Sequence, residues 1–140
     1  MRVLLIFSLV FLCSCGPRSM DDYRHEGRES IRSLTTQLRN IQSRQDLVRA
    51  APQLKAGFNR MVDLMIAARE YYESHHGAGI PELTEEDQEY SQELRLEIDR
   101  IMRIEGADKL MAKYQEEAHH RLHLFQTRLE GKKLFRNKIQ

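Results

Sequence analysis

The residues best suited to chemistry near the start of this chain are its two cysteines, Cys13 and Cys15, which lie one residue apart. A close cysteine pair can form a redox couple or contribute to a metal site. The sequence before them indicates something else, because Arg2 is followed by ten residues, 3–12, of which only Ser8 is polar. A positive charge and a short apolar run are typical of an export signal. A run of this length is too short to cross a bilayer, which takes about 20 residues.

The tetrapeptide "LCSC" at positions 12–15 resembles the lipobox of bacterial lipoproteins. In that family an aliphatic residue and two small residues precede the cysteine that is modified. The resemblance implies that residues 1–14 are a cleaved signal peptide and that the sulfur of Cys15 receives a diacylglycerol, after which the new amino terminus is acylated. Cys13 does not fit the modified position, because the large Leu12 precedes it. With Cys13 removed and Cys15 converted to a thioether, no thiol remains for a disulfide, a zinc site or a nucleophile.

The residues after Cys15 indicate where such a protein works. In two-membrane bacteria an aspartate after the lipidated cysteine favours the inner membrane, and here that residue is Gly16. The resemblance therefore implies a lipid-anchored protein of the bacterial cell envelope, on the outer membrane and facing the periplasm. Residues 15–22 lack apolar periodicity and predict a flexible tether, whereas residues 23–140 predict a single helical domain.

The six histidines invite a metal hypothesis. His119 and His123 lie four residues apart, on neighbouring turns of a helix. Glu116 with His119, like Glu73 with His76, has the Glu-x-x-His spacing of carboxylate di-iron bundles. At about 100° per residue, His119 and His123 lie roughly 100–140° from the apolar face of their helix, so we expect both to face water. They are at most candidates for a weak surface site for zinc or copper, and no cofactor is predicted.

The other chemically capable residues do not form a catalytic pattern. The sequence contains no nucleophile elbow, glycine-rich phosphate loop or zinc motif, and every acidic residue falls on the polar side of a helical pattern. Met61 and Met65 lie in an apolar stripe, where methionine usually fills core gaps. Tyr71, Tyr72 and Tyr114 are expected to line the end of a bundle. We therefore predict no catalytic residues and a protein that is not an enzyme.

Charge is distributed unevenly, although the whole chain carries a net charge of only +1. Residues 15–76 carry +2, residues 77–117 carry −7 and residues 118–140 carry +5. The simplest arrangement places the acidic segment against the two basic ones. Such internal neutralisation argues against a nucleic-acid partner.

Apolar spacings of three and four predict helices along most of the chain after the tether. One helix is expected over residues 22–41 and a second over residues 47–72, with a kink or short break near Ala51 because Pro52 removes a backbone donor.

Two capping pairs mark helix starts, Ser43 with Asp46 and Thr84 with Asp87. Beyond the second pair, the apolar phase passes through Gly106 without an extra residue. We therefore predict one long helix over residues 85–131, in an elongated three-helix bundle or helical hairpin. A four-helix bundle that turns at Gly106 is the alternative.

A weaker resemblance concerns the sequence "LTEEDQ" at residues 83–88, which is similar to the Leu-Thr-x-x-Gln motif of small helical periplasmic proteins related to the Spy chaperone. That likeness implies client binding, or zinc binding as in some members. The leading expectation is different: a lipid-anchored envelope protein whose helical domain serves as a structural or protein-interaction module for another envelope protein. Client binding of the chaperone type, or weak metal binding, is the alternative.

Overall fold

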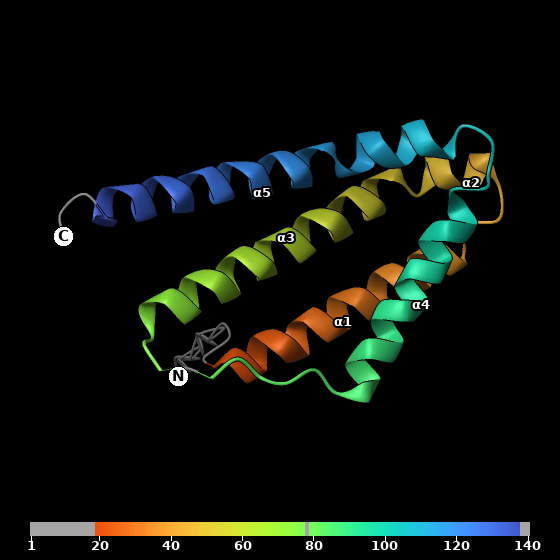
Figure 1. Ribbon diagram of the computed structural model, residues 1–140. Coiled ribbons are helices and arrows are strands. Elements are labelled where there is room, and N and C mark those ends of the chain that lie inside the picture. Colours follow the sequence, from red (N-terminus) through yellow and green to blue (C-terminus); the bar gives the residue numbers. More distant parts are fainter. Residues whose placement is uncertain (1–18, 78, 138–140) are drawn as a thin grey trace, which may run out of the picture.

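The computed structural model describes residues 19–77 and 79–137 of the 140-residue chain, with side chains through Lys132 (Figure 1). These residues form five helices and no strand. The helices are α1 (Met20–Arg39), α2 (Arg44–Arg49), α3 (Ala51–Ser74), α4 (Glu85–Ile101) and α5 (Ala107–Asn137). The predicted all-α class with a long C-terminal helix is therefore confirmed.

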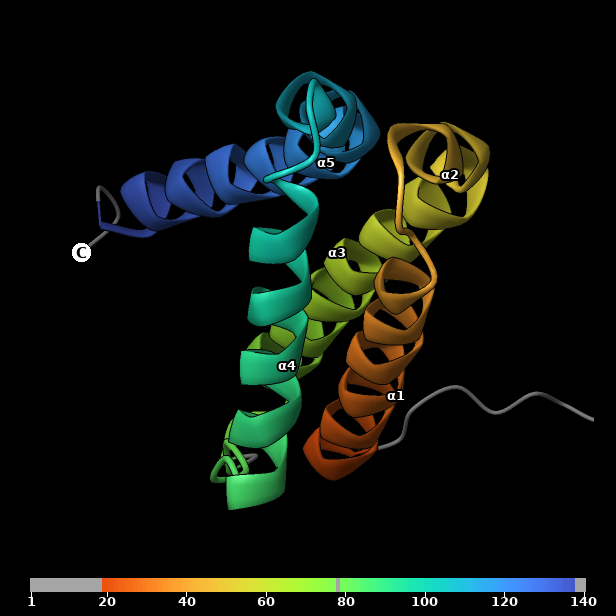
Figure 2. The ribbon, with the colours of Figure 1, turned by 90° about the vertical axis from the view of Figure 1, so that its right-hand side faces the viewer.

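The helices form an open bundle. α1 packs against α3, α4 packs on α1, and α5 packs on α3, while the short α2 contacts α3 and α5. The four long helices therefore follow one another in space in the order α5, α3, α1, α4. Beyond the turn that joins them, α4 and α5 diverge (Figures 1 and 2), so the bundle is open on the side between these two helices.

The core is aliphatic, as expected for a chain without tryptophan. Its most deeply buried large side chains are Leu34, Leu38, Ile41, Leu47, Leu54 and Ile101. Burying one such side chain contributes about 1.5–3 kcal/mol. Tyr114 of α5 is buried beside them and donates a hydrogen bond to the Leu47 carbonyl at 3.3 Å. This contact joins α5 to α2 across the core.

The starts of α2 and α4 follow the predicted capping residues. The Ser43 hydroxyl accepts a hydrogen bond from the Asp46 N–H at 3.2 Å, and α2 begins directly after it. Thr84 and Asp87 form a complete capping box at the start of α4. Pro52 lies in the first turn of α3, where its missing N–H costs little. The break predicted near Ala51 is thus confirmed as the boundary between α2 and α3.

The first helix begins and ends earlier than the apolar spacing predicted. α1 starts at Met20, because the Ser19 hydroxyl accepts a hydrogen bond from the Asp22 N–H at 3.1 Å. It ends at Arg39 rather than near Ile41. Part of the segment predicted as a tether, residues 15–22, is therefore helical, which brings the folded domain closer to Cys15.

The prediction of one helix over residues 85–131 is wrong, and the alternative that turns at Gly106 is confirmed. α4 ends at Ile101 and α5 begins at Ala107. Gly106 adopts a φ of +72°, the left-handed conformation that side chains with a Cβ disfavour. Ile101 and Ala107 are both buried on either side of this turn, so the apolar phase continues although the helix does not.

Replacing Gly106 with alanine should lower the free energy of unfolding by about 1 kcal/mol, because the left-handed conformation brings the alanine Cβ too close to the backbone. Crowding is a minor factor, since the new Cβ would lie 3.4 Å from the Arg44 Nε. Urea titration followed by circular dichroism measures the change. Gly131→Ala is the matched control, because that position lies in α5 with no atom near its Cβ, and it should not destabilise the protein. An unchanged stability for Gly106→Ala would contradict the assigned turn.

Candidate functional site

The best-defined polar cluster joins α1 to the start of α4. Asp87 is only 7% exposed, and Arg28 approaches its carboxylate with Nε at 2.8 Å and Nη2 at 2.7 Å. Arg24 lies 3.5 Å away through Nη1, and Arg28 also pairs with Glu86 at 2.8 Å. Because Arg24 and Arg28 are four residues apart on α1, both guanidinium groups lie on one face of that helix.

The expectation that every acidic residue lies on a polar face is therefore wrong for Asp87. Its carboxylate accepts hydrogen bonds from the Thr84 N–H and hydroxyl, both at 2.9 Å, as well as from Arg28. The pKa of Asp87 falls to about 2, chiefly because of the hydrogen bond from the Thr84 backbone and against the opposing effect of burial, with Arg28 adding to the decrease. The same carboxylate thus caps α4 and holds it against α1.

Stability should fall as the pH drops from about 4 to about 2. The folded-state pKa of Asp87 lies below its ordinary value of 3.8, so its contribution is present above pH 4 and is lost as the pH falls through 2. The pKa of Asp46 is also lowered, first by the hydrogen bond from the Ser43 hydroxyl and then by that from the Gln42 backbone. Protonation of Asp46 in acid should therefore lower the stability of the fold as well.

Thermal melts across this pH range should show that Asp87→Asn is less stable at pH 7 and has a shallower decrease in acid than the natural chain. Asp99→Asn removes an exposed carboxylate of α4 and should keep its stability at pH 7. An Asp87→Asn curve parallel to that of the natural chain would contradict the role assigned to this carboxylate.

The predicted charge pairing is confirmed for one basic segment and wrong for the other. On α1, Arg39 approaches Glu93 at 3.0 Å and Glu97 at 3.6 Å on α4, in line with the cluster around Asp87. Two arginines of α5 instead pair with α3. Arg121 pairs with Asp63, and Arg128 pairs with Glu70 at 2.5 Å. Packing order explains the difference, because α5 lies beside α3 and not beside α4.

These pairings leave the outer face of α4 acidic. A shallow depression on this face is lined by Glu85, Gln88, Glu89, Gln92, Glu93 and Leu96; we call this set the α4 outer face. Within the part of the chain that the structure describes, no ion pair reaches Glu85 or Glu89. Leu96 is 57% exposed among them. The face therefore combines unneutralised negative charge with an exposed leucine.

The candidate metal residues His119 and His123 lie exposed on α5, as the helical spacing predicted. Across residues 19–77 and 79–132, no three histidine, cysteine or acidic side chains gather in a way that could hold a metal ion. His120 lies beside Glu116 and Glu117 in a shallow depression between α5 and α3. Among the side chains that the structure describes, none joins His119 and His123 as a third ligand.

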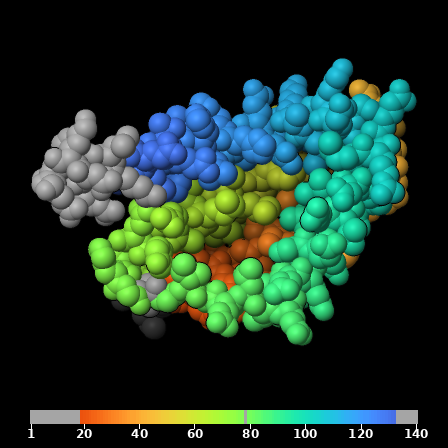
Figure 3. Space-filling view, in the orientation of Figure 1, coloured from red at the N-terminus to blue at the C-terminus, as the bar shows by residue number. Residues whose placement is uncertain are grey.

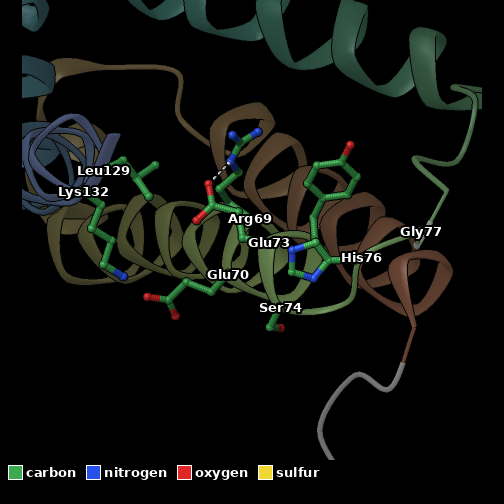
Figure 4. Close-up of a pocket in the computed structure, with 9 residues that line it drawn as sticks. Arg69, Glu70, Glu73, Ser74, His76, Gly77, Leu129 and Lys132 are labelled. Carbon is green, nitrogen blue, oxygen red and sulfur yellow. Dashed lines mark hydrogen bonds and ion pairs between the residues drawn. The ribbon is translucent and has the colours of Figure 1, made fainter. Parts of the chain in front are cut away.

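The other Glu-x-x-His pair, Glu73 and His76, lines an open hollow of about 840 Å³ at the end of α3, which Leu129 and Lys132 of α5 border (Figure 4). The Arg69 Nε forms an ion pair with the Glu73 carboxylate at 3.0 Å. The hollow thus has mixed charge, and Glu73 already has a cationic partner.

The methionine and tyrosine predictions are confirmed in part. Met61 is partly buried against the core, but Met65 is 52% exposed and does not fill the core as predicted. Tyr71 and Tyr72 lie near the end of α3, where the Tyr71 ring packs against Tyr23 with centroids 5.6 Å apart. Tyr114 is instead buried in the core.

Cys15 and Cys13 lie outside the described residues. Among the described helices, none is long and apolar enough to cross a membrane. Comparison with known proteins gives one result: no family model, no curated protein and no solved structure matches this chain.

Proposed function

We propose that this protein is a lipid-anchored component of the bacterial cell envelope, attached to the outer membrane through Cys15, whose helical domain binds another envelope protein. The observation that carries the proposal is the lipobox-like tetrapeptide, which ends only a few residues before the first helix. The tetrapeptide "LCSC" ends at residue 15, and α1 starts at Met20. At about 3.3–3.6 Å per extended residue, the Cα of Met20 can lie at most about 18 Å from the Cα of Cys15.

The α4 outer face is the surface proposed to bind the partner. Exposed apolar side chains within a charged rim are common in protein interfaces, where the apolar part supplies affinity and the charges supply orientation. The carboxylates of Glu85 and Glu89 beside Leu96 favour a partner with a basic surface and an apolar pocket. The ion pairs between α1 and α4 hold this face in place on the domain.

A photoreactive amino acid at position 96 should capture one envelope protein in intact cells. The matched control is position 124 on α5, because Leu124 is 56% exposed, close to the 57% of Leu96. Position 124 should not capture the same protein. Mass spectrometry of the purified crosslinked product identifies the partner.

Reversing a single charge on the α4 outer face distinguishes specific binding at the proposed interface from non-specific binding. Glu89→Lys should reduce capture at position 96. Glu130→Lys, which reverses the charge of an exposed residue on α5, should not. Capture of many unrelated unfolded proteins at position 96 would contradict a specific partner and favour the client-binding alternative. Equal capture at positions 96 and 124 would contradict the assignment to α4.

A further inference from the structure

An apolar cavity of about 260 Å³ lies between α1 and α3, next to the start of α1. Near the end of α1 and the start of α3 the contact between these helices is close, because a Cβ added to Gly57 would lie 3.1 Å from Leu34 Cδ1. Beyond this contact, toward the start of α1, the cavity opens. Its apolar lining includes Met20, Gly27, Ile31, Met61, Met65 and Ala68. Figure 3 shows the hollowed face above α1 and α3, between α4 and α5.

The lining suits a flexible apolar group. Three of its residues, Met20, Met61 and Met65, are methionines, whose unbranched side chains adapt to irregular apolar ligands. An apolar cavity of about 150 Å³ is large enough to bind benzene, so this one accepts a longer group. Met65 leaves one side of it accessible, being half exposed.

One polar atom of the lining lacks a partner. Arg24 borders the cavity, and within the described part of the chain its buried Nε–H has no hydrogen-bond acceptor. The other nitrogens of this guanidinium are paired, with Asp21 at 2.8 Å and Asp87 at 3.5 Å. These carboxylates offset the charge of Arg24, so the cavity does not need a charged occupant.

We propose that this cavity holds the first part of an acyl chain carried by the protein's own Cys15. The inference rests on the proposed lipidation. Met20 lines the cavity, and only residues 16–19 separate it from Cys15, so the Cα of Cys15 can lie at most about 18 Å from the Cα of Met20.

A photoreactive fatty acid with a diazirine near its carboxyl end tests the proposal in cells that make the full-length protein. Once incorporated, it should crosslink to peptides of this chain that contain Tyr23, Met61 or Met65, which mass spectrometry maps. Mixing cells grown on light and heavy isotopes shows whether the two ends come from one molecule. Crosslinks only to membrane phospholipid, to a second copy or to another protein would overturn the proposal.

A variant that fills the cavity provides the control. Gly27 lines it with no atom within 4 Å of an added Cβ, so in Gly27→Leu the leucine should extend from the backbone into the cavity and fill part of it. It should reduce the internal crosslinks at least fivefold, with fatty-acid incorporation at Cys15 unchanged. Gly131→Leu, the same change at an open helical position of α5, should alter neither. Unchanged internal crosslinks in Gly27→Leu would overturn the cavity assignment, whereas absence of fatty acid on Cys15 in the natural chain would overturn the proposed function itself.

Discussion

Replacing Cys15 with serine is expected to abolish lipid labelling of this protein and to move it from the membrane fraction to the soluble fraction, or to leave it unprocessed. Serine has no sulfur to form the thioether that the lipobox resemblance implies. Each buried methylene of an acyl chain contributes about 0.8 kcal/mol to membrane binding, so two or three chains account for the whole anchor. Metabolic labelling with a fatty-acid analogue, followed by membrane fractionation, measures both effects.

Cys13→Ser is the matched control, because it makes the same replacement of sulfur by oxygen at the cysteine two residues earlier. Serine is also small, so it preserves the pattern of an aliphatic residue and two small residues before Cys15. Labelling and fractionation should therefore resemble those of the natural chain. Loss of labelling in Cys13→Ser alone would show that the modified cysteine is assigned wrongly, and labelling of Cys15→Ser would show that the anchor is elsewhere.

The anchor and the fold together constrain how the domain meets the membrane. α1 begins at Met20, so the end of the bundle that contains the first turn of α1 is the end at which the chain leads back to Cys15 in the sequence. The last turns of α3 lie at the same end, because Tyr23 packs against Tyr71. If the protein is anchored as proposed, this end faces the bilayer and the turn at Gly106 points away from it.

The starts of α2 and α4 could be predicted because each depends on residues close together in sequence. A capping box needs only a hydroxyl and a carboxylate three positions apart, and Thr84 with Asp87 satisfies it whatever surrounds the helix. The same holds for Ser43 with Asp46. Pro52 likewise acts through its own missing N–H. These local signals predict helix starts correctly because they do not depend on how the helices pack against one another.

The turn at Gly106 could not be predicted from apolar phase. Ile101 and Ala107 are six residues apart, and both are buried on either side of a turn, as they would be along one helix. Periodicity reports which residues face the core but not whether the chain between them is helical. The left-handed φ of Gly106 decides that question, and a glycine inside a helical pattern is also compatible with an unbroken helix.

The polar cluster at Asp87 was hidden for a related reason. Its role depends on Arg28, which is 59 residues earlier in the chain, and a single sequence gives no sign that these side chains meet. The exposure of Met65 was hidden likewise, because it depends on the open cavity between α1 and α3. Local pattern predicts elements, whereas contacts between elements depend on the angles at which they pack.

A second large effect is expected at Arg100, whose role is equally invisible in the sequence. Its Nη2 donates to the Leu38 carbonyl at 2.7 Å and its Nη1 to the Ile41 carbonyl at 2.8 Å. The Leu38 carbonyl lies in the last turn of α1 and also accepts a hydrogen bond from the Ile41 N–H at 3.0 Å, whereas the Ile41 carbonyl lies two residues beyond the end of the helix. Arg100 therefore caps α1 from the last turn of α4, while its Nε pairs with Glu97 at 2.8 Å.

Replacing Arg100 with methionine should lower the free energy of unfolding by about 2–3 kcal/mol. Methionine keeps much of the aliphatic length, so the loss isolates two hydrogen bonds from a charged donor, each contributing about 1.5–3 kcal/mol before partial replacement by water. Urea titration measures the change. Arg103→Met removes an exposed guanidinium three residues later and should stay within about 0.5 kcal/mol of the natural chain.

Arg100→Lys distinguishes a cap from a simple charge effect. Lysine restores the positive charge beside Glu97, but its single ammonium cannot reproduce the fork that reaches both carbonyls. It should therefore recover the ion pair and less than half of the lost stability. Full recovery by lysine would mean that charge near Glu97, and not capping of α1, is what Arg100 contributes. A loss in Arg100→Met no larger than that in Arg103→Met would mean that water caps α1 as well as the guanidinium does.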